Sequence, residues 1–400
     1  MNRAADNAMQ LTNEHHQRAM NDETKARRPR KRWKRVFKWS VSAILLLLVA
    51  WIFIAYWTST NDCERYTATP ANPMKAVVYC DYGLTNLKVQ EIEKPSPADD
   101  QVLVRVRAAS LNPLDGHFVR GMWLARLMGG GLRKPKDTRL GVDYAGTVET
   151  VGKNVTQFKP GDEVFGARDG SLAQYVCARA DRAVALKPAN MAFEQAGSVA
   201  VAAITALQGL RDIGHLQTGQ KVLINGASGG VGTFAVQIAK ALGAEVTGVC
   251  STRNLDLVRS IGADHVIDYT KENFTKSDQR YDVIFDNVQN HTFSERRHVL
   301  APNGICVNVG LGGAGWRSDT QTHLIRSFTT PLISKFTSQK FRFFIAQLNH
   351  QDLALLADLM QSGKVTPVID RNYKSLSDVQ DALAYLEQGH ARGKVVLTVE

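Results

Sequence analysis

The stretch from Lys221 to Tyr269 constrains the fold of this chain most strongly, because it contains the successive parts of a dinucleotide-binding unit. The short β-branched run Val222–Ile224 has the composition of a parallel strand that is buried on both faces. The glycine-rich turn Gly226–Gly232 follows, and apolar residues then recur at helical spacing as far as Leu242. This order predicts an α/β fold with a parallel sheet that binds a nicotinamide cofactor.

The glycine turn carries the predicted pyrophosphate site. Gly229 lets backbone N–H groups approach a phosphate, Gly232 lets the helix pack closely on the strand, and the helix N-terminus contributes partial positive charge. Ala227 stands where the first glycine of the usual G-x-G-x-x-G fingerprint is found. The cofactor contacts predicted in the turn are Ala227, Ser228, Gly229, Gly230, Val231 and Gly232.

The residues that follow the second strand indicate which nicotinamide cofactor is bound. After Val246–Val249 come Ser251, Thr252 and Arg253, with no carboxylate to accept a hydrogen bond from a ribose 2′-OH. Two hydroxyl groups and a guanidinium are suitable donors for a 2′-phosphate. We therefore predict NADPH as the cofactor, with a solvated loop position for Arg253 as the alternative.

Further motifs occur in order along the remainder of the chain. They are Met74–Tyr79, Val104–Pro113, Gly141–Gly146, Gly161–Gly166, the glycine turn and His390–Val396. In these motifs the chain resembles the medium-chain dehydrogenase/reductase superfamily, in its zinc-free branch of zeta-crystallin-like quinone oxidoreductases and alkenal/enone reductases. The resemblance implies a GroES-like β domain plus a Rossmann domain with a doubly wound parallel sheet.

The expected domain organisation combines this resemblance with the composition of the N-terminus. Its parts are a basic polar tail (1–39), a single transmembrane helix (40–57), a linker (58–73), the first part of the GroES-like catalytic domain (74–194), the Rossmann NADP-binding domain (195–314) and a C-terminal segment that returns to the catalytic domain (315–400).

The sequence argues against a zinc site. Related alcohol dehydrogenases bind catalytic zinc through Cys and His, whereas Asn112 and Val142 stand at the matching positions here and only Asp143 keeps a carboxylate. Four closely spaced cysteines would be needed for structural zinc. No C-x-x-C pair exists among Cys63, Cys80, Cys177, Cys250 and Cys306. We therefore expect no metal.

Without zinc, a substrate carbonyl has to be polarised by hydrogen bonds, which favours hydride addition to enones, enals and quinones. Asn112 and His117, which follow the predicted strand Val102–Ala108, are the candidate catalytic donors. His117 could equally be part of the pocket wall. The alternative functions are an NAD(P)-dependent alcohol dehydrogenase acting on simple alcohols or aldehydes, and a non-catalytic nucleotide-sensing scaffold at a membrane.

Other cofactor contacts follow from position in the resemblance or in the sheet. Thr205 matches a hydroxyl near the nicotinamide, and Tyr269 matches a tyrosine near the adenosine phosphate. Val309 and Gly310 end a predicted strand at the carboxyl edge, where open α/β sheets bind ligands. Gly393 and Lys394 return from the C-terminus toward the cofactor, although Lys394 could equally be a surface charge.

The 17-residue apolar run Val41–Trp57 predicts a single-pass membrane anchor, with aromatic residues near one end. A buried core helix and a cleaved signal peptide fit this run less well. Residues 1–39 carry 11 Lys/Arg against 4 Asp/Glu, a net charge of +7 out of the total of +11. This charge predicts contact with anionic lipid and not with nucleic acid.

The positive-inside rule places the basic tail in the cytoplasm and the enzyme domain on the far side of the membrane. Free NADPH is scarce there, so the sequence does not decide which side the enzyme domain faces. Five scattered cysteines show no disulfide framework, which favours a reducing compartment. Residues 331–346 mix Phe with Lys and Arg, which suits a lipid surface or a subunit contact such as that of a homodimer, with core packing as the default explanation for the aromatic residues.

Overall fold

The computed structural model describes residues 3–26, 29–310, 334 and 337–399. The chain divides into two compact units, Met1–Ser59 and Thr60–Glu400. The predicted domain boundary at 314/315 and part of the segment 331–346 lie outside the described residues.

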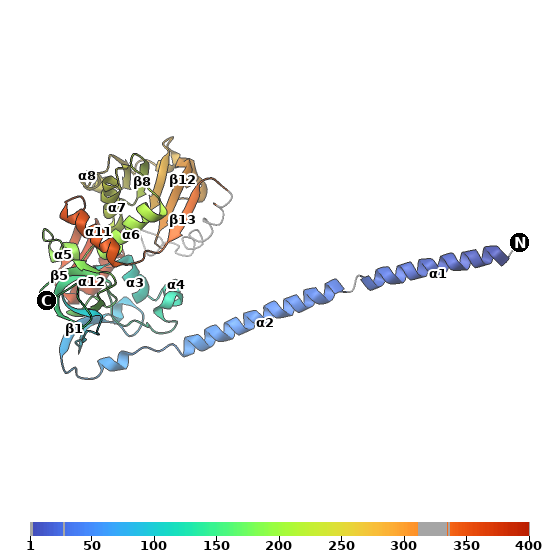
Figure 1. Ribbon diagram of the computed structural model, residues 1–400, viewed down its shortest axis with the longest axis horizontal. Helices are drawn as coiled ribbons and strands as arrows, with labels where there is room; N and C mark the ends of the chain where they lie inside the picture. The colour runs from blue at the N-terminus through green and yellow to red at the C-terminus, as the bar shows by residue number, and fades with distance from the viewer. Residues whose placement is uncertain (1–2, 27–28, 311–333, 335–336, 400) are drawn as a thin grey trace. The chain divides into compact units, whose positions relative to one another are not determined.

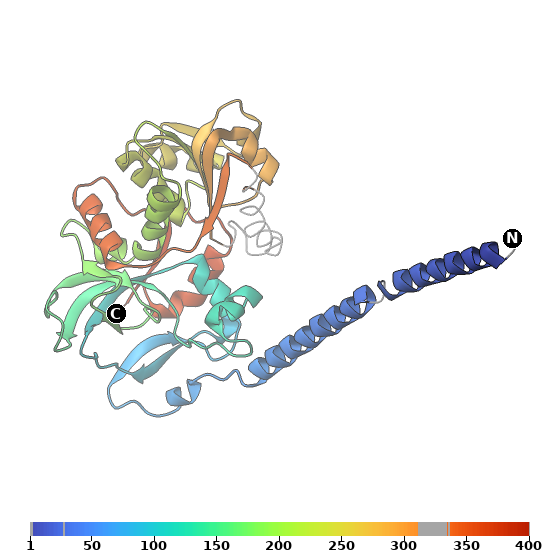
Figure 2. The same ribbon diagram turned by 45° about the vertical axis from the view of Figure 1, so that its right-hand side comes forward.

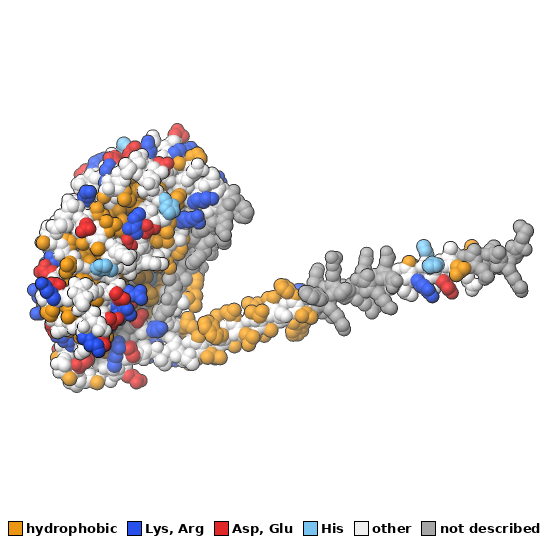
Figure 3. Space-filling model, viewed as in Figure 1, with side chains coloured by type: hydrophobic (Ala, Val, Ile, Leu, Met, Phe, Trp, Pro, Cys, Tyr) orange, Lys and Arg blue, Asp and Glu red, His pale blue; other side chains and the backbone are white. Residues whose placement is uncertain are grey.

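The N-terminal unit consists of the helices α1 (Arg3–Ala26) and α2 (Pro29–Trp57). Within α2, the 22 residues Val36–Trp57 have a mean hydropathy of 2.3, and apolar side chains cover the face of this part that Figure 3 shows. At 1.5 Å per residue this part is about 33 Å long, close to the ~30 Å hydrocarbon thickness of a bilayer. By length and composition it is a candidate membrane span.

The unit Thr60–Glu400 contains a β lobe, whose β1 (Pro73–Val78) and β2 (Lys88–Glu93) pair antiparallel. Among the described residues its larger sheet has the order β14-β15-β3-β4-β5-β7, and β6 also pairs with β3. The strands of this sheet are β3 (Gln101–Leu111), β4 (Asp143–Val151), β5 (Glu163–Ala167), β6 (Tyr175–Arg179), β7 (Val184–Leu186), β14 (Ile369–Tyr373) and β15 (Lys394–Thr398). The helices of the lobe are α3 (Pro113–Val119), α4 (Trp123–Ala125), α5 (Phe193–Ala196) and α12 (Val379–Leu386).

The second lobe is a parallel sheet with helices packed against it (Figure 1). Its strands are β8 (Lys221–Asn225), β9 (Glu245–Cys250), β10 (His265–Asp268), β11 (Tyr281–Asp286), β12 (Leu300–Val309) and β13 (Lys340–Phe344). Its helices are α6 (Ala200–Gln208), α7 (Gly230–Ala241), α8 (Leu255–Ser260), α9 (Phe293–Val299) and α11 (His350–Gln361).

The strand order of this parallel sheet is β10-β9-β8-β11-β12-β13, so the chain reverses its winding direction between β8 and β11. A doubly wound sheet binds its ligand at the carboxyl ends of the strands beside such a switch point. The predicted α/β class, with a GroES-like β lobe and a Rossmann-type sheet, is confirmed (Figure 2).

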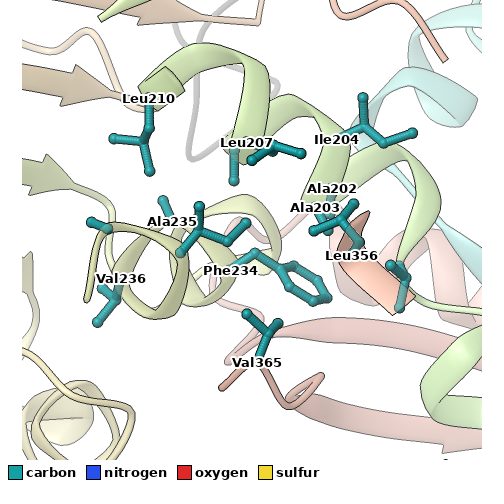
Figure 4. Packing of buried hydrophobic residues seen from close by; sticks show 14 of the residues in the cluster. Ala202, Ala203, Ile204, Leu207, Leu210, Phe234, Ala235, Val236, Leu356 and Val365 are labelled. Carbon is teal, nitrogen blue, oxygen red and sulfur yellow. The ribbon is translucent and has the colours of Figure 1, made fainter. Parts of the chain in front are cut away.

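The largest apolar core lies between α6, α7 and α11 (Figure 4). Small residues on α6, including Ala202 and Ala203, let α7 approach closely, and Phe234 of α7 fills the space that they leave. Burial of such side chains stabilises the lobe by roughly 25 cal/mol per Å² of apolar surface. The core therefore holds α7, which begins at the glycine turn, firmly against the sheet.

The expectation that the chain has no disulfide is wrong. Cys63 and Cys80 form a disulfide with a Cα–Cα distance of 5.9 Å, and Cys177, Cys250 and Cys306 are free thiols. No sequence motif marks the pair, which is separated by 17 residues.

The short 3₁₀ turn Cys63–Tyr66 packs against the β lobe, so the predicted linker 58–73 is not a free linker over its whole length. The Tyr66 hydroxyl lies 2.7 Å from Thr138 Oγ1, and the Asn61 side chain donates to the Cys80 carbonyl at 2.7 Å. Tyr66 is buried in a small apolar cluster with Met74. The β lobe thus includes residues that precede the predicted start of the domain.

Candidate active site

Three adjacent strands bring the central polar residues of the β lobe together. In the antiparallel ladder, Ser110 of β3 pairs with Asp143 at the start of β4, and Leu111 of β3 pairs with Val395 of β15. Asn112 follows β3 directly and begins α3. Lys394 is the first residue of β15. Residues that are far apart in the sequence therefore meet at one end of these three neighbouring strands.

These residues form one hydrogen-bonded network around Asp143. Its Oδ2 accepts from Ser110 Oγ at 2.9 Å, from Asn112 Nδ2 at 3.0 Å and from Lys394 Nζ at 3.1 Å. Its Oδ1 accepts from the backbone N–H of Val201 at 2.8 Å, in the first turn of α6. Lys394 Nζ also donates to Asn112 Oδ1 at 2.6 Å. The network connects the β lobe with the helix that leads into the parallel sheet.

The Lys394–Asp143 ion pair is deeply buried, with side-chain exposures of 3% and 0%. Burying two charges is tolerated only where good geometry and additional hydrogen bonds compensate for lost hydration. Besides Lys394, Asp143 has three hydrogen-bond donors, which meets this condition. The ion pair is therefore an integral part of the fold where β3, β4 and β15 come together.

The donor set around Asp143 does not fit a zinc ion. Zinc sites use thiolate, imidazole and carboxylate ligands, whereas Asp143 is surrounded here by an ammonium, an amide and a hydroxyl. In the part of the chain that the structure describes, no group of three or more His, Cys, Asp or Glu side chains could hold a metal ion.

Asp115 lies in the first turn of α3 and is buried next to this network. Its Oδ2 accepts from the Asn112 backbone N–H at 2.7 Å. Burial raises the pKa of Asp115 from its ordinary value to about 7, and the charge of Asp143 adds to the effect. The carboxyl group therefore holds its proton in the folded state up to near-neutral pH, whereas it loses that proton near pH 4 in the unfolded chain.

Asp115→Asn should make the protein more stable than the wild type at pH 8 but not at pH 4. Because the folded-state pKa of Asp115 is raised, the folded chain binds more protons, and wild-type stability falls as pH rises from about 4 to about 7. The neutral amide lacks this dependence, and the difference approaches at most roughly 4 kcal/mol above pH 7. Chemical unfolding across this pH range measures it.

Asp256→Asn, at an exposed position, should follow the wild type at every pH. Parallel pH profiles of Asp115→Asn and wild type would contradict the raised pKa of Asp115.

His117, the second predicted donor, lies on α3 and is buried. Its Nδ1 contacts the Met122 thioether. Burial lowers the pKa of His117 to about 4, against a smaller opposing effect from Glu387. At neutral pH the imidazole is uncharged, so it is able to donate one N–H hydrogen bond but does not act as an imidazolium acid.

The glycine turn has the geometry of a phosphate cradle. Gly229 is the N-cap of α7, and a Cβ placed there would meet only the Gly226 carbonyl, at 3.6 Å. A Cβ on Gly232 would come within 2.0 Å of the Gly226 carbonyl oxygen, so this position requires glycine. Ala227 is buried below the turn. The open space at Gly229 and the helix N-terminus fit the pyrophosphate of a dinucleotide.

The residues predicted to bind a 2′-phosphate each make a hydrogen bond to a different group of the protein. Arg253 Nη2 donates to the His390 carbonyl at 2.6 Å, and Thr252 Oγ1 donates to Asp268 Oδ2 at 2.6 Å. The oxygens of Ser251 and of Ser228, in the glycine turn, both accept from Asn254 Nδ2, at 3.2 and 3.0 Å. Ser251 is thus linked to the turn through Asn254, whereas the Thr252 hydroxyl is bonded to a carboxylate and Arg253 to a backbone carbonyl.

The remaining predicted cofactor residues lie at the carboxyl edge or beside it. Thr205 Oγ1 donates to the Val201 carbonyl within α6. The carbonyls of Val309 and Gly310 accept from Gln289 Nε2, at 3.1 and 3.0 Å. Tyr269 is exposed at the end of β10.

Gly393 has a φ of 111°, which lets the chain turn into β15 and aims Lys394 at Asn112 and not at solvent. The alternative of Lys394 as a surface charge is therefore wrong.

Two asparagines at the carboxyl edge of the parallel sheet, Asn254 and Asn287, were not predicted from the sequence. Asn254 bridges the glycine turn and the end of β9, and its Oδ1 has no hydrogen-bond partner among the described residues. Asn287 follows β11 at the switch point, and both polar atoms of its side chain are hidden from solvent without such a partner. Buried polar atoms without a hydrogen-bond partner are rare in folded proteins, so each needs an explanation, such as a functional role. The sequence feature that could have indicated a role for Asn287 is its position directly after a central strand.

Two family models match the chain. The model described as "Alcohol dehydrogenase GroES-like domain" matches residues 98–189, and "Zinc-binding dehydrogenase" matches residues 261–397. The first covers the central strands of the β lobe, and the second covers the later part of the parallel sheet and β15.

The chain is similar to several characterised reductases. It is 36% identical over 339 residues to a 2-methylene-furan-3-one reductase of Solanum lycopersicum, covering 81% of this chain and 79% of that protein. It is 36% identical to the chloroplastic NADPH-dependent alkenal/one oxidoreductase of Arabidopsis thaliana, covering 85% and 83%. It is 34% identical to the mitochondrial NAD(P)H oxidoreductase RTN4IP1 of Bos taurus, covering 88% and 89%.

A quinone oxidoreductase structure from Coxiella burnetii superimposes with a TM-score of 0.72 at 30% identity, covering 82% of this chain and all of that one. The chain therefore belongs to the medium-chain dehydrogenase/reductase superfamily. It is an NAD(P)H-dependent oxidoreductase.

Proposed function

We propose that this protein is a zinc-independent, NADPH-dependent reductase of quinones or α,β-unsaturated carbonyl compounds. The observation that carries the proposal is the Asp143–Asn112–Lys394 network, which supplies hydrogen-bond donors at the place where zinc-dependent relatives need metal ligands. The reductase names of several relatives support the same substrate class. The open cradle at Gly229 and the unsatisfied amide of Asn287 support the cofactor.

NADPH, when bound, supplies a hydride to the electrophilic carbon of the substrate. The protein residues then stabilise the charge that develops on the substrate oxygen. Asn112, the N-cap of α3, offers an amide N–H, and neutral His117, in the last turn of the same helix, is the second candidate donor. Conjugated substrates suit this arrangement because their oxygen lies away from the carbon that accepts the hydride. Uptake of one proton completes the reduction.

Steady-state oxidation of NADPH against a panel of quinones, enals, enones and simple aldehydes tests the proposal. Turnover confined to the conjugated compounds is expected. Turnover confined to simple aldehydes would support the alcohol dehydrogenase alternative, and cofactor binding without any turnover would support the nucleotide-sensing scaffold.

Removal of divalent metal should leave the enzyme unchanged. Because an ammonium and an amide occupy the space around Asp143, dialysis against a strong chelator should change neither kcat nor the melting temperature. A zinc-dependent alcohol dehydrogenase, treated in parallel, should lose its activity. Stoichiometric zinc in elemental analysis of the purified protein would contradict the proposal.

Arg253→Ala should reduce the preference for NADPH over NADH. The Arg253 side chain is held at the His390 carbonyl by one nitrogen, which leaves other guanidinium N–H groups for a 2′-phosphate. A charge-assisted phosphate contact is worth about 1.5–3 kcal/mol, so the ratio of the two Kd values should fall by about one to two orders of magnitude.

Fluorescence titrations with both cofactors measure the two Kd values. Arg259→Ala is a suitable control, because Arg259 lies nearby on α8 and pairs with Asp256. Equal affinities of the wild type for NADPH and NADH would contradict the proposed specificity.

We further propose that Val36–Trp57 anchors the protein in a membrane and that the basic tail contacts anionic lipid. The length and hydropathy of this helix support a span, and the Cys63–Cys80 disulfide, six residues after it, supports an oxidising side for the enzyme domain. A spanning helix resists extraction by high salt, whereas attachment through the tail alone is screened within about 8 Å at physiological salt. Release of the full-length chain by salt would contradict the anchor.

A further inference from the structure

The orientation of the Asn112 amide is fixed by two charged neighbours. Lys394 Nζ lies 2.6 Å from Asn112 Oδ1, and Asp143 Oδ2 lies 3.0 Å from Asn112 Nδ2. An ammonium is only a donor and a carboxylate is only an acceptor. A flipped amide would place its N–H groups against the ammonium and its oxygen against the carboxylate, so only one orientation satisfies both neighbours.

The position of Lys394 is in turn fixed by the glycine turn. A Cβ on Gly230 would come within 3.1 Å of Lys394 Cδ, so the lysine stem passes directly over this glycine. Its ammonium reaches Asn112 and Asp143 and is almost fully buried there. One side chain therefore contacts both the turn that would hold the cofactor pyrophosphate and the amide that would hold the substrate oxygen.

Asp143 gives the arrangement its rigidity. Ser110 Oγ and the Val201 backbone N–H donate to it at 2.9 and 2.8 Å, in addition to its contacts with Asn112 and Lys394. The Asn112 Nδ2 group has two N–H bonds, of which one is used by Asp143. The second makes no hydrogen bond to a described residue, so it is the N–H that a substrate oxygen would have to meet.

We propose that Lys394 is a positioning residue that holds the Asn112 amide so that its second N–H faces the substrate oxygen. This role differs from the direct cofactor contact that sequence analysis expected, and it rests on the proposed reductase function. Lys394 then contributes to kcat through Asn112, because a donor aligned before the reaction costs no reorganisation as charge develops on the oxygen.

Lys394→Met tests the proposal in the full-length protein. It should lower kcat at least tenfold with the best quinone or enone, while the Kd for NADPH, measured by fluorescence, should stay within about twofold of the wild-type value. Lys394→Arg keeps a buried cationic donor and should recover part of the lost kcat. Lys364→Met, at an exposed lysine, should change none of these values.

Loss of the buried positive charge in Lys394→Met could lower stability, so a second variant separates folding from positioning. The double variant Lys394→Met with Asp143→Asn has no unpaired buried charge and should regain the melting temperature of the wild type without regaining kcat. Recovery of kcat in this variant would overturn the positioning role.

Three results distinguish failure of the positioning role from failure of the proposed function. A Kd for NADPH weakened tenfold or more with kcat unchanged would show a cofactor-phosphate contact and would overturn the inference. Equal kcat in wild type and Lys394→Met would also overturn it, while leaving the proposed function intact. Absence of turnover in the wild type would instead contradict the proposed function itself.

Discussion

Arg296→Met is expected to lower the free energy of unfolding by about 3 to 5 kcal/mol. Arg296 is 1% exposed, and its Nη1 donates to Asp286 Oδ2 at 2.9 Å and to Asn308 Oδ1 at 2.5 Å. Asp286 is fully buried at the end of β11. Removing one partner of a buried ion pair leaves an uncompensated charge, which accounts for the expected magnitude. Urea unfolding followed by fluorescence measures the loss.

Arg297→Met provides a matched control, because Arg297 is the next residue on α9 but is exposed, donates to the neutral Gln339 side chain and lies over the Phe293 ring. Its loss should cost about 1 kcal/mol. Asp286 directly precedes Asn287 at the switch point, so Arg296→Met should also weaken NADPH binding. Similar destabilisation by both arginine variants would contradict this account of the buried pair.

Local patterns account for the part of the fold that the sequence predicted well. The strand, glycine turn and helix between Lys221 and Ala241 are consecutive, and each part constrains the next. The helix starts at Gly230 because Gly229 has an extended conformation at its N-cap, and the sequence pattern indicated the same point. Predictions of this kind need only sequence neighbours and the period of a helix or strand.

The network at Asp143 could not be predicted in this way. Lys394 is 282 residues from Asn112 and 251 from Asp143, and only the pairing of β15 with β3 and of β3 with β4 brings them together. Sequence position placed Lys394 near the cofactor, which is consistent with its stem over Gly230. The destination of its ammonium depends on tertiary packing, which no periodicity encodes.

Asn254 and Asn287, at the parallel sheet, likewise could not be identified from local sequence patterns. Asn254 and Asn287 carry no motif, and a polar residue after a strand is common in loops. Their unsatisfied side-chain atoms become visible only when neighbouring elements are in place. The disulfide was missed for a similar reason, because two cysteines without a spacing motif do not indicate a bond.

A chain that starts at Ala71 should be markedly less stable than one that starts at Thr60. The domain start predicted from the sequence is residue 74, but the earlier start retains Cys63 and Tyr66, which bind the β lobe. The disulfide separates residues 17 apart, and closing a loop of this length in the unfolded chain is worth about 3 kcal/mol. Loss of the buried Tyr66 side chain adds about 1.5–3 kcal/mol.

Thermal unfolding of both shortened chains, with and without a thiol reductant, separates the two contributions. The chain from Thr60 should lose stability on reduction, whereas the chain from Ala71 should not respond, because Cys80 has lost its partner. Cys63→Ser in the chain from Thr60 should have the melting temperature of that chain in its reduced form, since Tyr66 stays bound through Thr138. Equal melting temperatures for the two chains without reductant would show that residues 60–70 add nothing to the fold. The difference expected instead means that the segment following the apolar helix is part of the enzyme domain.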